Sequence, residues 1–374
     1  MFRAPYIPLL FLTALFLSLG IVAQFYDLFS LQCIAGLFLL SLILTSSRVN
    51  KKHILPFVCC IATFCVGAFL LHTQKKSHNT VYYALTSGAF SAQGTIIDIQ
   101  KQGHTKLAYR ITVRIEKYKT KKTDWQDIST KIVLNTSSPE TWAKNSGICV
   151  GDVVILHNLF AIRTDESFLL YLMRESIGVY IFCPTPCITV VSRSAYSHCR
   201  FIHQLRMETE EKLNQKFSSC VRILFAALFL GKKIRHVQSN NDLPDHFRQW
   251  GISHLLARSG MHLSIFIFVC FLLFRMMPVP LILKYFFSLI VCSIYFLLSY
   301  TSLSFERALI TALFFFIFQL IKRPTNLLHT TTLAFIYFLI TNPIALFFLD
   351  FQLSFLFTAT LAWLIQYQKK LIIK

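Results

Sequence analysis

The sequence predicts a polytopic α-helical membrane protein with a small all-β domain inserted between its helices. Three observations lead to this fold class. Of the 374 residues, 55% are apolar and only 14% are charged, about half the charged fraction of an ordinary soluble domain. The apolar residues gather into long runs, and about 20 of them in a helix cross a bilayer. Between two groups of runs lies a segment with the alternating pattern of β-strands.

Three apolar runs open the chain, at residues 6–25, 28–46 and 54–72. The first is too long for the apolar core of a signal peptide and lacks a small-residue cleavage site, so we expect an uncleaved span. Basic residues separate the second and third runs. The positive-inside rule then predicts a cytoplasmic N-terminus and three transmembrane helices in residues 1–72, the third ending outside.

Residues 73–190 predict an extracytoplasmic β-domain. Apolar and polar residues alternate in five short stretches, and glycines between them supply turn signals. The stretches are Ser91–Ile99, Leu107–Tyr118, Lys131–Asn135, Val153–Ile162 and Ile177–Cys183. Five short strands suit a small barrel of the OB type. A small sandwich has the same pattern.

Residues 191–250 predict amphipathic and interfacial helices. Apolar residues of Arg200–Ser218 recur at helical spacing, with charged residues on the other face. The apolar stretch Val221–Leu230 is too short to cross a bilayer comfortably, so we expect a re-entrant or interfacial element.

Residues 251–374 predict about five further spans, which makes about eight in all. Their approximate positions are 259–277, 279–299, 307–321, 327–342 and 350–367. Basic and non-basic loops alternate between them, and this alternation predicts five crossings that start outside and end in the cytoplasm. The orientation agrees with the one derived from the first three spans.

The net charge of +20 suits the basic cytoplasmic loops of an inner-membrane protein. It also suits a polyanionic partner such as nucleic acid. Five of the eleven cysteines lie in or just after the β-domain, where Cys183 or Cys187 could pair with Cys149 or Cys199 in an oxidising compartment. No zinc-ligand spacing is present, so we expect neither a metal site nor a cofactor.

A run of twelve residues carries a family resemblance. Gly251-Ile-Ser-His-Leu-Leu-Ala-Arg-Ser-Gly-Met-His262 resembles the signature of the ComEC competence family of DNA-uptake proteins. Further elements follow the family's order: Ala227–Gly231, Ser304–Ala308, Asn342-Pro343 and Phe351–Phe355. The resemblance covers nearly the whole chain, and its sharp motifs lie in residues 225–355.

This sequence departs from the family pattern at three points. Arg258 stands where the signature usually has Ile, and Lys232 stands where an acid usually follows Gly231. The His-x-His-x-Asp-His metal cluster of the family's metallo-β-lactamase-like domain is absent. We therefore expect a channel without that nuclease chemistry and no enzyme activity.

The resemblance implies an inner-membrane channel that takes single-stranded DNA into the cytoplasm during natural transformation. It also implies a DNA receptor and a cytoplasmic helicase-like ATPase as partners. The sequence is compatible with a monomer or a homodimer in the lipid bilayer. Two alternatives stay open: a transporter of another anionic polymer or solute, and a degenerate membrane protein without transport.

Polar residues in apolar spans usually face a cavity or a partner, so we expect the signature segment to line the pathway. The candidate pore residues are Gly251, Ser253, His254, Arg258, Ser259, Gly260, His262 and Arg307. Arg307 could instead snorkel to the interface or form a structural ion pair. Gln352 and Ser354 are expected to form interhelical hydrogen bonds.

A basic cluster in the β-domain is a candidate nucleic-acid contact. It comprises Lys117, Lys119, Lys121 and Lys122, with Trp125 nearby. Single-strand sites combine cations along the backbone with aromatic side chains that stack on bases. The more ordinary interpretation is a solvated hairpin tip.

Overall fold

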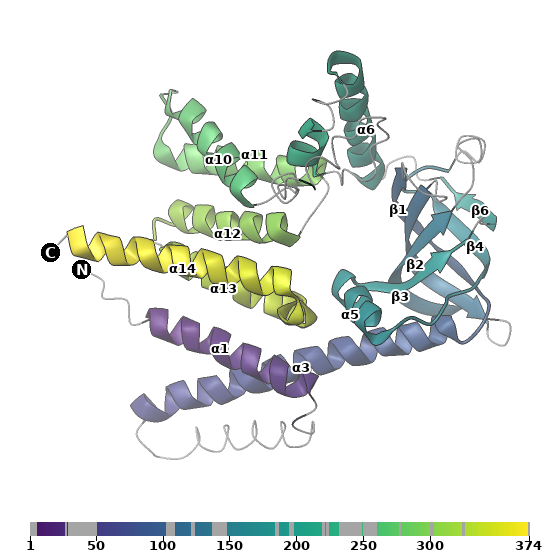
Figure 1. Cartoon of the computed structure of the whole chain (residues 1–374), viewed down its shortest axis with the longest axis horizontal. Helices are drawn as coiled ribbons and strands as arrows, with labels where there is room; N and C mark the ends of the chain where they lie inside the picture. Colours follow the sequence, from purple (N-terminus) through teal and green to yellow (C-terminus); the bar gives the residue numbers. More distant parts are fainter. Residues whose placement is uncertain are drawn as a thin grey trace. The chain divides into compact units, whose positions relative to one another are not determined.

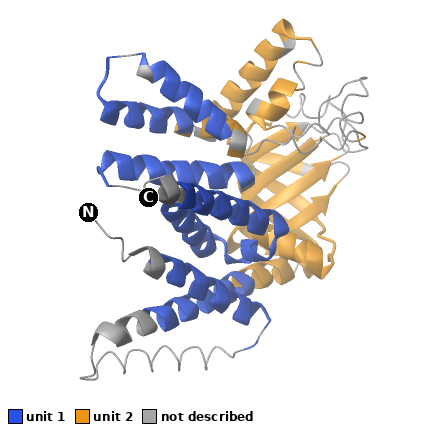
Figure 2. Cartoon of the chain, turned by 60° about the vertical axis from the view of Figure 1, so that its left-hand side comes forward, with its two compact units in different colours: residues 1–76, 263–292, 303–374 blue, residues 77–262, 293–302 orange. Residues whose placement is uncertain are grey.

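The computed structural model describes residues 6–26, 28, 51–101, 109–120, 124–136, 148–183, 187–193, 198–218, 221, 224–231, 249, 260–276, 278–299, 303–323 and 326–372. The chain forms two compact units (Figure 2). Unit 1 is assembled from three stretches of chain: residues 1–76, 263–292 and 303–374. Unit 2 comprises residues 77–262 and 293–302.

Helices make up the described part of unit 1 (Figure 1). They are α1 (Tyr6–Phe25), the first part of α3 (Lys51–Thr86), α10 (Gly260–Arg275), α11 (Leu281–Leu298), α12 (Leu303–Leu320), α13 (Leu327–Thr341), the 3-10 helix η3 (Pro343–Phe347) and α14 (Leu349–Ile372). A helix thus covers each predicted apolar run that falls on described residues. Of the predicted run at 28–46, residues 29–46 lie outside them.

The helices of unit 1 expose large apolar side chains. On α14, Leu356 is 63% and Phe357 is 70% exposed, and on α10 Phe268 is 65% exposed. Within the described residues, α11 alone is long and apolar enough to cross a membrane by itself. Shorter apolar helices occupy Leu10–Phe25, His262–Phe274, Leu327–Thr341 and Leu349–Ile365.

Two glycines bring α1 and α3 into backbone contact. A Cβ at Gly20 would overlap the carbonyl oxygen of Phe64, and a Cβ at Gly67 would overlap that of Leu17. Small residues allow such a close approach of two helix backbones. The two helices pack closely because neither glycine carries a side chain.

Helix α3 is longer than the apolar run that predicted it. The run ends at residue 72, whereas the helix continues to Thr86. No glycine or proline interrupts residues 73–86, and Tyr82 and Leu85 are buried in the core of the β-domain. Apolar length indicates where a bilayer ends, but capping and tertiary packing decide where a helix ends.

Unit 2 is built on a mixed six-stranded sheet (Figure 1). Its strands are β1 (Phe90–Lys101), β2 (Tyr109–Thr120), β3 (Gln126–Thr136), β4 (Val153–Leu159), β5 (Ile177–Phe182) and β6 (Cys187–Ser192). Their order is β5-β3-β2-β1-β4-β6, with β3 and β5 parallel and the other pairs antiparallel. The five predicted strands are confirmed, and β6 is an addition that pairs with β4.

The closed OB-type barrel stays a prediction. Strands β5 and β6 end the hydrogen-bonded order, and within the described residues no pairing joins them. A helix that the sequence pattern did not predict, α5 (Glu166–Glu175), lies between β4 and β5 and places Leu172 in the core. Inward-facing side chains fill that core, among them Ile96, Ile111, Val113, Ile132, Leu134, Val154 and Leu156.

Two further helical elements follow the sheet. Helix α6 (His198–Lys216) agrees with the predicted amphipathic helix and buries Leu213, but Phe201 and Phe217 of its predicted apolar face are 63% and 45% exposed. The π-helix η1 (Ala226–Leu230) ends at Gly231, whose φ of 75° lies in the left-handed region. Glycine adopts this conformation at no steric cost, which explains its place in the Ala227–Gly231 motif.

Candidate functional site

The described structure places three of the eight candidate pore residues. Gly260 and His262 lie in the first turn of α10 and are half-buried, and Arg307 lies near the start of α12. Gly251, Ser253, His254, Arg258 and Ser259 lie outside the described residues. The strongest geometry therefore surrounds Arg307.

Arg307 is buried, with 3% of its surface exposed. One terminal nitrogen, Nη1, donates a 2.7 Å hydrogen bond to the backbone carbonyl oxygen of Asp350, and Nη2 donates a 2.9 Å hydrogen bond to Ser304 Oγ. Its guanidinium carbon lies 5.6 Å from the ring centroids of both Phe351 and Phe355. Hydrogen bonds and ring faces thus take the place of water around a buried cation.

Two sequence motifs from distant parts of the chain meet at this arginine. Ser304 and Arg307 belong to the Ser304–Ala308 element, and the two rings belong to the Phe351–Phe355 element. Phe351 and Phe355 pack at 4.7 Å between centroids, and Phe335 of α13 lies 5.1 Å from Phe355. The arginine, which the sequence suggested for a pore mouth or an ion pair, packs between α12 and α14.

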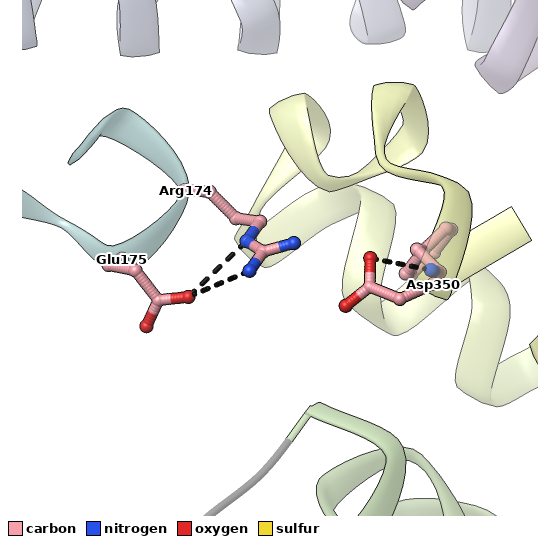
Figure 3. Close-up of polar contacts among 4 residues, drawn as sticks. Arg174, Glu175 and Asp350 are labelled. Atoms are coloured by element: carbon pink, nitrogen blue, oxygen red, sulfur yellow. Dashed lines mark hydrogen bonds and ion pairs between the residues drawn. The ribbon is translucent and has the colours of Figure 1, made fainter. Parts of the chain in front are cut away.

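Asp350 supports the same corner with its own side chain. Its carboxylate accepts a 2.9 Å hydrogen bond from the backbone N–H of Phe351 at the start of α14 (Figure 3). A carboxylate at a helix N-terminus is favoured because the first N–H groups have no partner within the helix. Figure 3 also draws the contact of the sequence neighbours Arg174 and Glu175 at the end of α5, 3.2 Å apart.

The Asn342-Pro343 element ends helix α13 and separates it from α14. Pro343 begins the buried 3-10 helix η3. The side-chain amide of Gln74 in α3 donates to Asn342 Oδ1 at 3.0 Å and accepts from the backbone N–H of Ile344 at 3.2 Å. The amide group of Gln74 therefore binds the residues on both sides of Pro343.

Lys75, next to Gln74, contacts the C-terminal end of α1. Its ammonium donates to the carbonyl oxygen of Phe25 at 3.2 Å and lies 4.7 Å from the centroid of that ring. The Phe25 ring in turn stacks on Phe347 of η3 at 3.8 Å. A cation at a helix C-terminus stabilises the unpaired carbonyls. Gln74 and Lys75 were not among the predicted site residues, although their signal was a polar pair directly after an apolar run.

Gln352 and Ser354, which were expected to form interhelical hydrogen bonds, differ in their partners. Gln352 is exposed and donates to the carbonyl oxygen of Leu346 in η3 at 2.8 Å. Its partner thus belongs to the short helix before α14. Ser354 is half-buried, and its backbone carbonyl accepts from the hydroxyl of Thr358.

The basic cluster of the β-domain contains acidic partners. Lys119 lies 3.5 Å from Asp124, whose side chain is fully exposed, and Lys117 on β2 is in register with Asp127 on β3. Trp125 is 41% exposed. Lys121 and Lys122 lie outside the described residues. These carboxylates offset part of the positive charge, and the nucleic-acid contact stays a prediction.

The described residues bear on two further predictions, the pairing of cysteines and the metal site. Cys183 is a free thiol, and the side chains of Cys187 and Cys199 lie outside the described residues. In the part of the chain whose placement is described, no group of three or more His, Cys, Asp or Glu side chains could hold a metal ion.

The contact between the Ser304–Ala308 and Phe351–Phe355 elements defines a class of protein with a helical domain built around these motifs. Residues 228–372 match the family model described as "Competence protein", so this part of the chain is similar to competence proteins, consistent with the ComEC type. The match confirms the resemblance carried by the sequence motifs. Neither a curated protein nor a solved structure matches the chain.

Proposed function

We propose that this protein is a multi-pass inner-membrane channel that carries single-stranded DNA into the cytoplasm during natural transformation. The competence domain of residues 228–372 supports a role in DNA uptake. The observation that carries the finer proposal is the corner around Arg307, where the family elements Ser304–Ala308 and Phe351–Phe355 pack around one buried cation. That packing keeps the helices of the channel domain in a fixed arrangement.

The membrane topology belongs to the same proposal. The N-terminus lies in the cytoplasm, the β-domain lies outside, and about eight helices cross the membrane. Exposed apolar residues such as Phe268 and Phe357 support contact with lipid. The signature segment 251–262 lines a wet path with weak successive contacts for phosphates, so that binding does not trap the polymer.

The protein itself would make or break no covalent bond. A cytoplasmic helicase-like ATPase would supply the energy for translocation, and a DNA receptor would deliver the strand to the β-domain. This division of labour rests on the family resemblance.

A complementation experiment tests the channel. A deletion strain receives the full chain, His254→Ala, Arg258→Ile or Arg307→Met, and the entry of labelled DNA into the cytoplasm is measured at equal protein levels. The Arg323→Met variant is the matched control, because Arg323 follows α12 and is exposed. We expect uptake to fall in at least the His254 and Arg307 variants. Unchanged uptake in all three would sink the channel proposal.

A second experiment tests the β-domain in the full chain, held in lipid discs. Binding of single-stranded DNA should weaken steeply with salt because phosphate contacts release counterions. The double variant Lys117→Gln, Lys119→Gln should lower the slope of log K against log salt by about one or two units. Binding that does not depend on salt would remove the β-domain from the DNA path.

A further inference from the structure

One arginine outside the competence domain binds the end of helix α11. Nη2 of Arg206 in α6 donates to the carbonyl oxygens of Leu297 at 2.8 Å and Ser299 at 3.0 Å, and Nε donates to that of Leu298 at 3.2 Å. Ser299 is fully buried, and its hydroxyl donates to the carbonyl oxygen of Tyr295 at 2.7 Å. All of these residues belong to unit 2 (Figure 2).

The last four carbonyl groups of a helix have no hydrogen-bond partner within it, and together they carry partial negative charge. Arginine suits this end because its donors form a rigid planar fork and its charge is permanent. Such a partner matters in α11, which among the described helices is long and apolar enough to cross a membrane by itself. Carbonyl groups left unpaired near lipid are costly.

Chain connectivity places this contact on a definite face. Helix α6 begins at His198, shortly after β6 ends at Ser192. The short link between the two elements reaches about 20 Å at most, less than the thickness of a bilayer core. The start of α6 must therefore lie on the face of the membrane that carries the β-domain. The charged residues Glu208–Lys212 keep the helix at that face, because charged side chains are costly inside a bilayer.

We propose that Arg206 is a positioning residue that holds the C-terminal end of α11 at the membrane face that carries the β-domain. The inference rests on the membrane topology of the proposed function. That topology already places the C-terminal end of α11 outside, and the inference adds that Arg206 of α6 fixes where α11 ends. Lys284 near the opposite end of α11 agrees with this direction under the positive-inside rule.

Thiol labelling in native membranes tests this role. In the full chain with its native cysteines replaced, Ser299→Cys is exposed to a membrane-impermeant maleimide applied from the β-domain side. The buried thiol should react slowly, and Arg206→Met should speed its labelling about tenfold or more, because charged hydrogen bonds are lost. Arg206→Lys should restore part of the protection, since it keeps a charge and donors. Lys212→Met, on the exposed face of α6, is the matched control.

Two outcomes overturn the positioning role. One is a labelling rate of Ser299→Cys that stays the same when Arg206→Met is added. The other is equally increased labelling of Ser288→Cys, a buried site in the middle of α11, because the whole helix would then be disturbed.

Further labels separate this inference from the proposed topology. Lys212→Cys in α6 and Asp124→Cys in the β-domain should react from one and the same side. Reaction from opposite sides would refute the shared face. Reaction of both only from the cytoplasmic side would refute the proposed orientation and leave the contact between Arg206 and α11 standing.

Discussion

Arg307 illustrates how a cation is kept inside an apolar helix bundle. A carbonyl group, a hydroxyl group and two ring faces surround its guanidinium. Arginine is better suited than lysine to such a place because its planar group stacks on rings and donates in several directions at once. The position therefore requires this particular side chain as well as a positive charge.

Replacing Arg307 should be costly. We expect Arg307→Met to lower the free energy of unfolding by about 2–4 kcal/mol, because the Asp350 carbonyl and the Ser304 hydroxyl lose a charged donor. Arg307→Lys should recover only part of that loss. Unfolding in mixed detergent micelles measures both, and the exposed Arg323→Met should stay within about 0.5 kcal/mol of the parent. Equal stability of the two methionine variants would contradict the structural role of the buried arginine.

His78 makes stability depend on pH. Its Nε2 donates to the carbonyl oxygen of Ile177 at 2.8 Å, and burial lowers the pKa of its imidazole. The folded chain thus favours the neutral ring, while the unfolded chain takes up a proton near pH ~6.5. Stability should be fully present above about pH 6.5 and should fall as the pH drops below it.

Burial also lowers the pKa of His203, so both histidines should contribute to this acid sensitivity. We expect His78→Gln to reduce the slope of stability against pH below about pH 6.5, and His78→Gln with His203→Gln to reduce it further. Unfolding at a series of pH values measures the slope. A slope that neither substitution changes would assign the acid sensitivity to other groups.

At the scale of elements, the contact of α1 with α3 depends on two glycines. Gly→Ala in a helix ordinarily stabilises it by about 1 kcal/mol or less. At Gly20 and Gly67 the sign should reverse, with a loss of about 1–3 kcal/mol, because the new methyl group meets a carbonyl of the other helix. Gly88→Ala is the control, since its Cβ would meet nothing within 4 Å. The comparison is made by unfolding in micelles, and a gain at Gly20 would refute the close packing.

The corner between α13 and α14 depends on a helix far away in the sequence. Gln74 bonds to Asn342 and Ile344, so Gln74→Leu and Asn342→Ala should each destabilise the chain. In a double-mutant cycle we expect a coupling energy of about 0.5–1.5 kcal/mol. Gln74→Leu paired with Thr360→Ala on the exposed part of α14 should show none. Additive losses for Gln74 and Asn342 would mean that their hydrogen bond is not formed.

At the scale of the whole molecule, the sequence predicts what is local. Apolar runs located the helices, alternation located five strands, and the Ser304 and Phe351 motifs marked residues that prove to be in contact. Helix α5 and strand β6 were missed because each is short and depends on tertiary partners: α5 packs on the core of the β-domain, and β6 pairs with β4.

Three residues that the sequence did not single out were missed for the same reason. Each of them forms hydrogen bonds with backbone groups of residues far along the chain: Gln74, Lys75 and Arg206. Neither periodicity nor a sequence motif indicates a partner of that kind. Their side chains are polar residues beside apolar segments, a pattern that also suits simple solvation. Only the tertiary fold tells the two apart.

Helix α3 has one more consequence. Its 36 residues extend about 54 Å, whereas the hydrocarbon layer of a bilayer is about 30 Å thick. With its apolar run seated in that layer, the helix must emerge into the headgroups near Thr73-Gln74-Lys75-Lys76, so the amide and ammonium that bind Asn342 and Phe25 would lie at the lipid–water boundary. The thickness of the surrounding lipid would then bear directly on how firmly the corner of α13 and α14 is held.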